Sequence, residues 1–268
     1  MAVTTDTLID DSAVLAGLFD TPGCAIFLDF DGTLVDLAPT PDGVRLEAGV
    51  AEALALLSRR HKGALAIISG RPVAQIDAML APLVLPVAGV HGVERRGADG
   101  QLRLAATPDV SPVLARAQAL AALYPGLLVE QKRGAVALHY RLAPELQELC
   151  VREMTDAVQA CPGILLLHGK MVLEAKPAAT DKGGAIAAFM LEAPFAGRRA
   201  VFAGDDTTDE AGFAFVEQAG GQGVKVGSGA SVASLRLASP AALRVVLLHA
   251  AVLAASPQTQ GVADDDSL

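Results

Sequence analysis

Short apolar runs alternate along the chain with longer segments in which apolar residues recur at helical spacing. Four predominantly apolar runs, at 25–28, 64–68, 84–88 and 199–203, are too short for helices and predict buried strands. Segments such as 47–60, with apolar residues on one side, predict the helices between them. Strands and helices that alternate in this way are typical of an α/β fold. We therefore expect a Rossmann-like parallel sheet with helices on its faces.

The pattern changes in the middle of the chain. A helical segment at 109–123 is followed by two alternating strands, a second helical segment at 144–160 and a further pair of short strands. This order is typical of an antiparallel α+β unit. We therefore expect residues 105–173 to form a smaller domain inserted into a core built from 1–104 and 174–268.

Composition and charge limit the function classes that the chain can serve. It has 268 residues, of which 52% are hydrophobic and 19% charged, which is enough to bury a substantial core. The formal net charge is −9, and the sequence holds no dense run of Lys and Arg. Because binding to a phosphate backbone needs a basic surface, we expect no nucleic-acid partner.

The cysteines and the termini bear on the compartment. Cys24, Cys150 and Cys161 are odd in number and show no C-x-x-C spacing, which favours a reducing, cytoplasmic setting. No apolar stretch approaches the roughly 18 residues of a membrane span, so we expect a soluble chain without a membrane partner. We also expect the chain to be a monomer. The polar tail 256–268 predicts disorder.

Carboxylates follow two of the predicted strands. Asp29 and Asp31 end the first run, and Asp205, Asp206 and Asp209 follow the last one. Because the carboxyl ends of parallel strands lie at one edge of a sheet, the two groups can meet there. Carboxylate oxygens are ligands that Mg²⁺ prefers, so the pattern predicts a magnesium site. Taken separately, each group also fits a plain Asp-Gly turn or a helix N-cap.

Three further polar residues stand at strand or helix ends. Ser69 can bind phosphate or merely cap a helix. His91 can contact substrate or make a structural hydrogen bond. Lys182 can neutralise the charge of a phosphate group or lie in solvent. Together with the carboxylates they suggest phosphoryl transfer, in which one carboxylate attacks phosphorus and a second moves the proton of the leaving group. The sequence has neither a Walker-type nor a kinase-type glycine loop, which argues against a nucleoside triphosphate donor.

Four motifs in this order resemble those of the haloacid dehalogenase-like (HAD) phosphatases. They are Asp29-Phe-Asp-Gly-Thr-Leu, Ser69-Gly-Arg, Lys182-Gly and Gly204-Asp-Asp-Thr-Thr-Asp, and they span the chain from about 25 to 210. The inserted segment lies between the second and third motifs, where one subgroup of sugar phosphatases carries an α/β cap. The resemblance implies a HAD core with an inserted cap domain.

A finer resemblance is to the trehalose-6-phosphate phosphatases. It rests on Gly89-Val-His-Gly, Glu130-Gln-Lys with His139-Tyr-Arg, Gly169-Lys-Met-Val-Leu-Glu and the full run Gly204 to Glu210. It implies an enzyme that hydrolyses trehalose 6-phosphate with Mg²⁺ through an aspartyl-phosphate intermediate.

The same resemblance assigns roles to residues. Asp29 is implied as the nucleophile and Asp31 as the general acid/base. The implied Mg²⁺ ligands are Asp29, the backbone carbonyl of Asp31 and Asp205, with Asp209 nearby. The implied phosphate-binding residues are Ser69, Gly70 and Lys182, and the implied residues for the rest of the substrate are Arg71, His91, Glu130, Lys132 and Glu174.

Other functions fit parts of the pattern. A phosphatase for sucrose 6-phosphate or a hexose phosphate would differ only in the inserted domain, and a phosphomutase would return the phosphoryl group to the sugar. A non-catalytic sugar-phosphate sensor would not need a nucleophile. A response-regulator receiver would not need the inserted domain.

Overall fold

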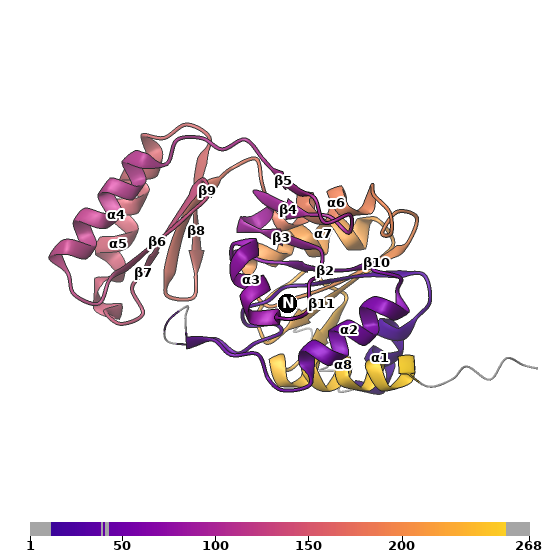
Figure 1. Ribbon diagram of the computed structural model, residues 1–268. Helices are drawn as coiled ribbons and strands as arrows, with labels where there is room; N and C mark the ends of the chain where they lie inside the picture. Colours follow the sequence, from indigo (N-terminus) through magenta and orange to yellow (C-terminus); the bar gives the residue numbers. More distant parts are fainter. Residues whose placement is uncertain (1–11, 39, 41–42, 256–268) are drawn as a thin grey trace, which may run out of the picture.

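The computed structural model describes residues 12–38, 40 and 43–255, and within these residues the strands form two sheets, one of eight strands and one of four (Figure 1). The strands of the larger sheet are β1 (Cys24–Leu28), β2 (Leu65–Ile68), β3 (Val87–Gly89), β4 (Glu94–Arg96), β5 (Leu102–Leu104), β10 (Arg199–Gly204), β11 (Gln222–Val226) and β12 (Leu235–Leu237). Their spatial order is β12-β11-β10-β1-β2-β3-β4-β5.

Strand β1 lies inside this sheet, between β10 and β2. Ile26 is in register with Val201 on one side and with Leu65 on the other, and both pairings are parallel. All neighbours from β12 to β3 are parallel, whereas β4 and β5 extend the edge as an antiparallel hairpin. The predicted parallel sheet is confirmed, and β1, β2 and β10 end at the same edge.

Helices cover both faces of the larger sheet (Figure 1). One face carries α1 (Ser12–Asp20), α2 (Val50–Arg60), α3 (Val73–Leu80) and α8 (Pro240–Ala255), and the other carries α6 (Lys182–Met190) and α7 (Glu210–Gln218). Residues of β1 alternate between the two layers, as a strand requires. Ile26 and Leu28 join the first cluster, whereas Phe27 packs against Phe189 with ring centroids 6.0 Å apart.

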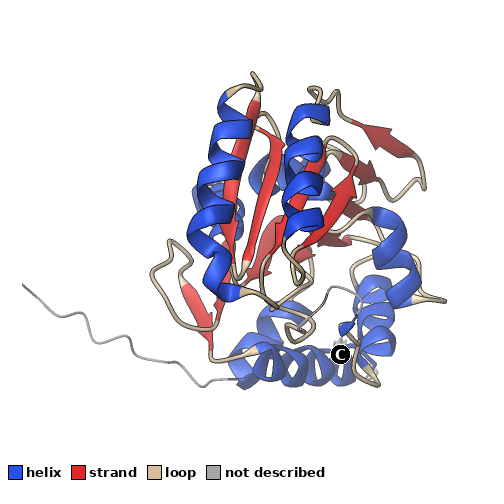
Figure 2. Ribbon diagram, turned by 90° about the vertical axis from the view of Figure 1, so that its left-hand side faces the viewer, coloured by secondary structure: helices blue, strands red, loops and turns tan. Residues whose placement is uncertain are grey.

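The smaller sheet is antiparallel and stands beside the larger one. It consists of β6 (Leu128–Lys132), β7 (Ala135–His139), β9 (Val172–Pro177) and β8 (Ile164–Gly169), in that spatial order. Helices α4 (Ser111–Leu123) and α5 (Gln147–Gln159) lie side by side on one of its faces (Figure 2). The chain enters this unit after β5 and returns to the core at α6. The domain boundaries at 105 and 173 stay a prediction, and β9 itself continues to Pro177.

Some details differ from the sequence pattern. The strand expected at 84–88 is Val87–Gly89, and the side chain of Val84 is 67% exposed. The pattern does not predict β4, β5 or β12, each of which is three residues long and partly exposed. The tail 256–268 lies outside the described residues. In the described part of the chain no helix combines the length and apolarity that a bilayer crossing needs.

Candidate active site

A cavity of about 190 Å³ lies between the carboxyl ends of the core strands and the open face of the smaller sheet. Its lining includes every site residue named from the sequence except Asp209. The members that line it are Asp29, Asp31, Ser69, Gly70, Arg71, His91, Glu130, Lys132, Glu174, Lys182 and Asp205. The fold thus gathers them in one place, while the roles assigned to them stay predictions.

The loop after β1 presents the first carboxylate. The Asp29 backbone N–H donates to the carbonyl of Ala203, 2.9 Å away, and so continues the pairing of β1 with β10. The Thr33 hydroxyl donates to Oδ2 of Asp29 at 3.0 Å. Gly32 has φ +79°, and a Cβ there would lie 2.3 Å from Oδ2 of Asp205. A glycine is therefore required for the Asp205 carboxylate to rest against this loop.

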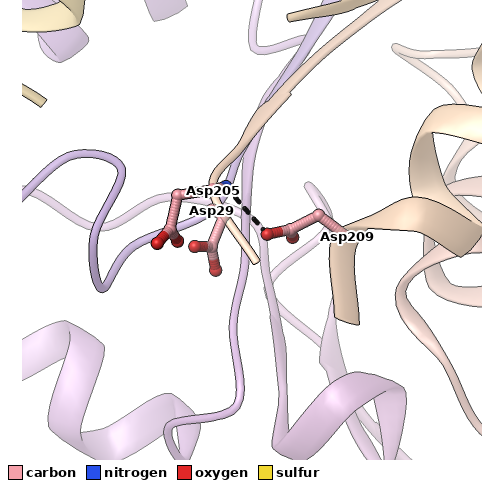
Figure 3. A group of neighbouring side chains, drawn as sticks. All are labelled: Asp29, Asp205 and Asp209. Carbon is pink, nitrogen blue, oxygen red and sulfur yellow. Dashed lines mark hydrogen bonds between the residues drawn. The ribbon is translucent and has the colours of Figure 1, made fainter. Parts of the chain in front are cut away.

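Three buried carboxylates meet at the base of the cavity. Asp29, Asp205 and Asp209 each offer an oxygen atom, and these three atoms all lie within 4.8 Å of one another. Figure 3 shows the carboxylates of Asp29 and Asp205 side by side, with Asp209 approaching from the next helix. Asp209 is fully buried, and its Oδ2 accepts the backbone N–H of Asp205 at 2.9 Å. It lies behind the cavity lining.

Two lysines enter this cluster from different elements. Nζ of Lys182, the first residue of α6, lies 2.7 Å from Oδ1 of Asp29 and 2.7 Å from Oδ1 of Asp209. Lys182 is 3% exposed, so its interpretation as a solvated side chain is wrong. Lys170, in the turn between β8 and β9, reaches across to Oδ2 of Asp205 at 2.6 Å.

The buried carboxylates of the cluster and the Lys182 ammonium shift one another's pKa values. Burial raises the pKa of Asp29 well above its usual range, and the charge of Asp209 adds to this effect while Lys182 opposes it. Burial also raises the pKa of Asp205. Burial by itself would lower the pKa of Lys182, but Asp209 and Asp29 outweigh it and raise that pKa. Carboxylate oxygens are ligands that a hard divalent cation prefers, and Asp29, Asp205 and Asp209, with oxygens within 4.8 Å of one another, fit such a site.

Asp31 has a different environment. Its side chain is not among the three carboxylates that the described residues bring within reach of one ion. Instead, Arg71 binds both of its oxygens, with Nε 2.6 Å from Oδ2 and Nη2 2.8 Å from Oδ1. A bidentate pair of this kind fixes the plane of the carboxyl group. Arg71 is only 8% exposed and lines the cavity.

The loop after β2 places Ser69 and Gly70. Ser69 is 1% exposed, and its Oγ accepts the backbone N–H of Arg71 at 3.1 Å. The N-cap of α3 is Pro72, so Ser69 is not a helix cap. A Cβ on Gly70 would lie 2.8 Å from Nε2 of His91, which explains a glycine between them.

The acidic run after β10 serves two purposes. Asp206 is the N-cap of a short 3₁₀ helix, η4 (Thr207–Asp209), and forms a capping box with Asp209. The helix-cap interpretation is therefore correct for Asp206, whereas the neighbouring Asp205 faces the cavity.

A charged network covers the cavity from the smaller sheet. Glu130 on β6 and Glu174 on β9 are both in register with Ala137 on β7, so they flank it on one face. Nζ of Lys132 lies 2.9 Å from Oε1 of Glu174 and 3.7 Å from Oε2 of Glu130. Nε2 of His91 lies 3.0 Å from Oε2 of Glu174 and so joins the core to the smaller sheet.

These contacts set the charge states of the network. Burial alone would raise the pKa of Glu174, but the charges of Lys132 and His91 outweigh it and hold that pKa well below its usual range. Burial would lower the pKa of Lys132, but the two glutamates outweigh it and raise that pKa. The cavity roof therefore carries fixed carboxylate acceptors and a fixed ammonium donor.

Some residues of the cavity were given no role from the sequence, although they stand in segments that carry the family resemblance. His139 lines it, and its Nε2 lies 3.2 Å from Oε2 of Glu130. His139 follows Ala137 by two positions on β7, so strand alternation is a signal that could have placed it on the same face. Lys170 and Arg141 also line the cavity, and both stand in segments that carry the family resemblance.

Comparisons with known proteins agree with this arrangement. The family model described as trehalose-phosphatase matches residues 27–241. The chain is 46% identical over 216 residues to a trehalose-6-phosphate phosphatase from Escherichia coli, covering 80% of this chain and 81% of that protein. It is 44% identical to a probable trehalose-phosphate phosphatase from Sinorhizobium fredii, covering 87% and 90%.

A solved structure also matches. The C-terminal domain of the Candida albicans trehalose-6-phosphate phosphatase superimposes with a TM-score of 0.83 at 23% identity, covering 93% of this chain and 99% of that chain, and shows the same fold. The family model spans most of the chain, and the Escherichia coli relative matches it over most of both lengths. The chain belongs to the trehalose-phosphatase family.

Proposed function

We propose that this chain hydrolyses trehalose 6-phosphate to trehalose and phosphate, with Mg²⁺ as its cofactor. The observation that carries the proposal is the two-ended character of one cavity. One end holds Asp29, Lys182 and Asp205, and the other holds Glu130, Lys132 and Glu174. The first set suits a phosphoryl group beside a divalent cation, and the second suits sugar hydroxyls, which both donate and accept hydrogen bonds.

The first chemical step is transfer of the phosphoryl group to Asp29. A carboxylate oxygen of Asp29 attacks phosphorus, the bond from phosphorus to the sugar oxygen breaks, and Asp31 gives that oxygen a proton. Lys182 places positive charge next to the reacting carboxylate, and Ser69 offers a hydroxyl at the adjacent strand end. Bound Mg²⁺, held by Asp29 and Asp205, would offset the negative charge of the phosphoryl oxygens.

The second step releases phosphate. Asp31 takes a proton from water, the water oxygen attacks phosphorus, and the bond to Asp29 breaks, which restores the free carboxylate. Arg71, bound to both oxygens of Asp31, keeps this group oriented for both proton transfers. Contacts from the smaller sheet, such as Lys170 to Asp205, help to enclose the cavity while the transfer takes place.

A direct experiment separates catalysis from mere binding. Phosphate release from trehalose 6-phosphate is measured with Mg²⁺, with EDTA, and for D29N, which keeps the shape of the side chain. We expect release that EDTA abolishes and that D29N lacks. If the unaltered chain binds the ester but releases no phosphate, a sugar-phosphate sensor is the better account. Substantial turnover by D29N would contradict its role as nucleophile.

A further inference from the structure

Lys225 is a buried cation close to the acidic cluster that has no part in the mechanism above. It lies on β11 in register with Gly204, the last residue of β10, and is 4% exposed. Val224 and Val226 point into the core cluster on one face of the sheet, so alternation turns Lys225 to the other face. Its ammonium donates to the backbone carbonyl of Asp205.

Packing alone does not explain an ammonium at this position. Within the described residues no carboxylate lies at ion-pair distance from Lys225, although a buried charge is costly unless it is compensated. A methionine side chain of similar length would fill the same space without that cost. The ammonium therefore contributes something besides volume.

The contact of Lys225 completes a clamp on one peptide segment. The backbone N–H of Asp205 donates to Oδ2 of Asp209 at 2.9 Å, and its carbonyl accepts from Lys225. Charged side chains thus hold both sides of the residue. A Cβ on Gly204 would lie 2.4 Å from Cγ of Asp209, so the backbone comes close to Asp209 just before the clamp.

The side-chain contacts of Asp205 are less firmly anchored. The hydroxyl of Thr33 lies 3.3 Å from its Oδ1, and the Lys170 side chain that meets its Oδ2 is 54% exposed and belongs to the smaller sheet. The backbone clamp thus adds two buried, charged contacts from the core to Asp205, whose carboxylate stands beside Asp29.

We propose that Lys225 is a positioning residue for the metal site: by binding the Asp205 carbonyl it aims the Asp205 carboxylate at the ion. Groups that orient a metal ligand in this way commonly change metal affinity by about 10- to 100-fold when they are removed. A purely electrostatic role has the opposite sign, because removing a nearby cation would strengthen the binding of Mg²⁺. The direction of the change therefore decides between the two.

The test is calorimetric titration of the substrate-free chain with Mg²⁺ for the unaltered protein, K225M and K176M. Lys176 is the matched control, since it is 3% exposed and, within the described residues, its ammonium donates to the carbonyls of Pro177 and Thr180 and not to Asp205. We expect K225M to raise the Mg²⁺ dissociation constant by about tenfold or more. We expect K176M to change it by less than about twofold.

Two further variants keep the proposal open to refutation. K225R, which retains donors and charge, is expected to recover part of the affinity. If K225M does not fold, K225Q, which has a shorter and neutral head, takes its place with the same expected loss. Unchanged or tighter Mg²⁺ binding in a folded K225M or K225Q overturns the proposal. The inference rests on the proposed metal site, and an unaltered chain that binds no Mg²⁺ would instead count against that site.

Discussion

Nζ of Lys182 lies 2.7 Å from Oδ1 of Asp29, although the two residues are 153 positions apart in the sequence. Both side chains are buried, and Asp209 stands on the other side of the same ammonium. Burial and the charge of Asp209 raise the pKa of Asp29, and Lys182 opposes this rise. Lys182 therefore helps to keep Asp29 in the ionised form that a nucleophile needs.

Replacing Lys182 by methionine tests that relationship. K182M leaves two buried carboxylates without their shared cation, so the negative charge on Asp29 and on the phosphoryl group is less well offset. We expect kcat/KM for trehalose 6-phosphate to fall by about 100-fold or more. The matched control is K62M at an exposed position, which should keep its activity. A loss of less than about threefold in folded K182M would contradict the role.

Glu174 offers a test of substrate recognition. E174Q keeps the volume of the side chain but removes the charge that binds Lys132 and His91. Hydrogen bonds to charged groups contribute about 1.5–3 kcal/mol, so we expect kcat/KM for trehalose 6-phosphate to fall by about 10- to 150-fold. Hydrolysis of p-nitrophenyl phosphate, which has no sugar, should change far less.

The control for this variant is E153Q. Glu153 lies on α5, where it pairs with Arg116 and Arg152 and does not line the cavity. It should leave both substrates unaffected. Equal losses on the sugar ester and the aryl ester in E174Q would place the effect on the chemistry and not on sugar recognition.

Gly32 tests how closely the two acidic loops must approach each other. G32A puts a Cβ 2.3 Å from Oδ2 of Asp205 at φ +79°, whereas G100A has a similar φ of +75° and nothing within 4 Å of its Cβ. Both variants should lose about 1–2 kcal/mol of unfolding free energy from the left-handed backbone. Only G32A should also displace Asp205, with about 10- to 100-fold weaker Mg²⁺ binding. Similar Mg²⁺ affinities for the two variants would refute this view.

His61 predicts a pH dependence of stability that is separate from catalysis. It is 1% exposed, with Nε2 2.7 Å from the carbonyl of Phe19, and burial lowers its pKa. The unfolded chain, with a His pKa of about 6.5, therefore binds a proton at a pH where the folded chain does not. As the pH falls below about 6.5, the unfolding free energy contributed by this site falls, by at most about 1.4 kcal/mol per pH unit.

Denaturant unfolding between pH 7 and pH 5 measures this dependence. H61Q, which can still donate to Phe19, should reduce the slope of unfolding free energy against pH. H168Q, at an exposed position, should leave it unchanged. An unaltered slope in H61Q would show that His61 does not titrate as proposed.

The spacing of apolar residues along the chain predicted the strands and helices that bury a regular set of side chains. Strand β1 reads as a short apolar run because it lies inside a sheet covered on both faces, and α2 reads as a helix because one side of it is apolar. The hairpin β4–β5 was not predicted, since it lies at a sheet edge where Arg95 and Arg103 are paired across the strands and burial imposes no apolar pattern.

The residues of the candidate site also divide into those that the sequence pattern predicted and those that it did not. Asp29, Asp205 and Lys182 could be named because each stands at a strand or helix end, where parallel topology brings such residues together. The contact of Lys170 with Asp205 and the clamp formed by Lys225 could not be named. They depend on how two sheets face each other and on strand register, which no short sequence window contains.

The substrate preference of the chain is tested most directly by comparing kcat/KM for a panel of phosphate esters in the presence of Mg²⁺. The panel contains trehalose 6-phosphate, sucrose 6-phosphate, glucose 6-phosphate and p-nitrophenyl phosphate. We predict a strong preference for the trehalose ester that E174Q reduces. A chain that hydrolyses all four esters equally well, or that prefers another sugar, would contradict the substrate assignment.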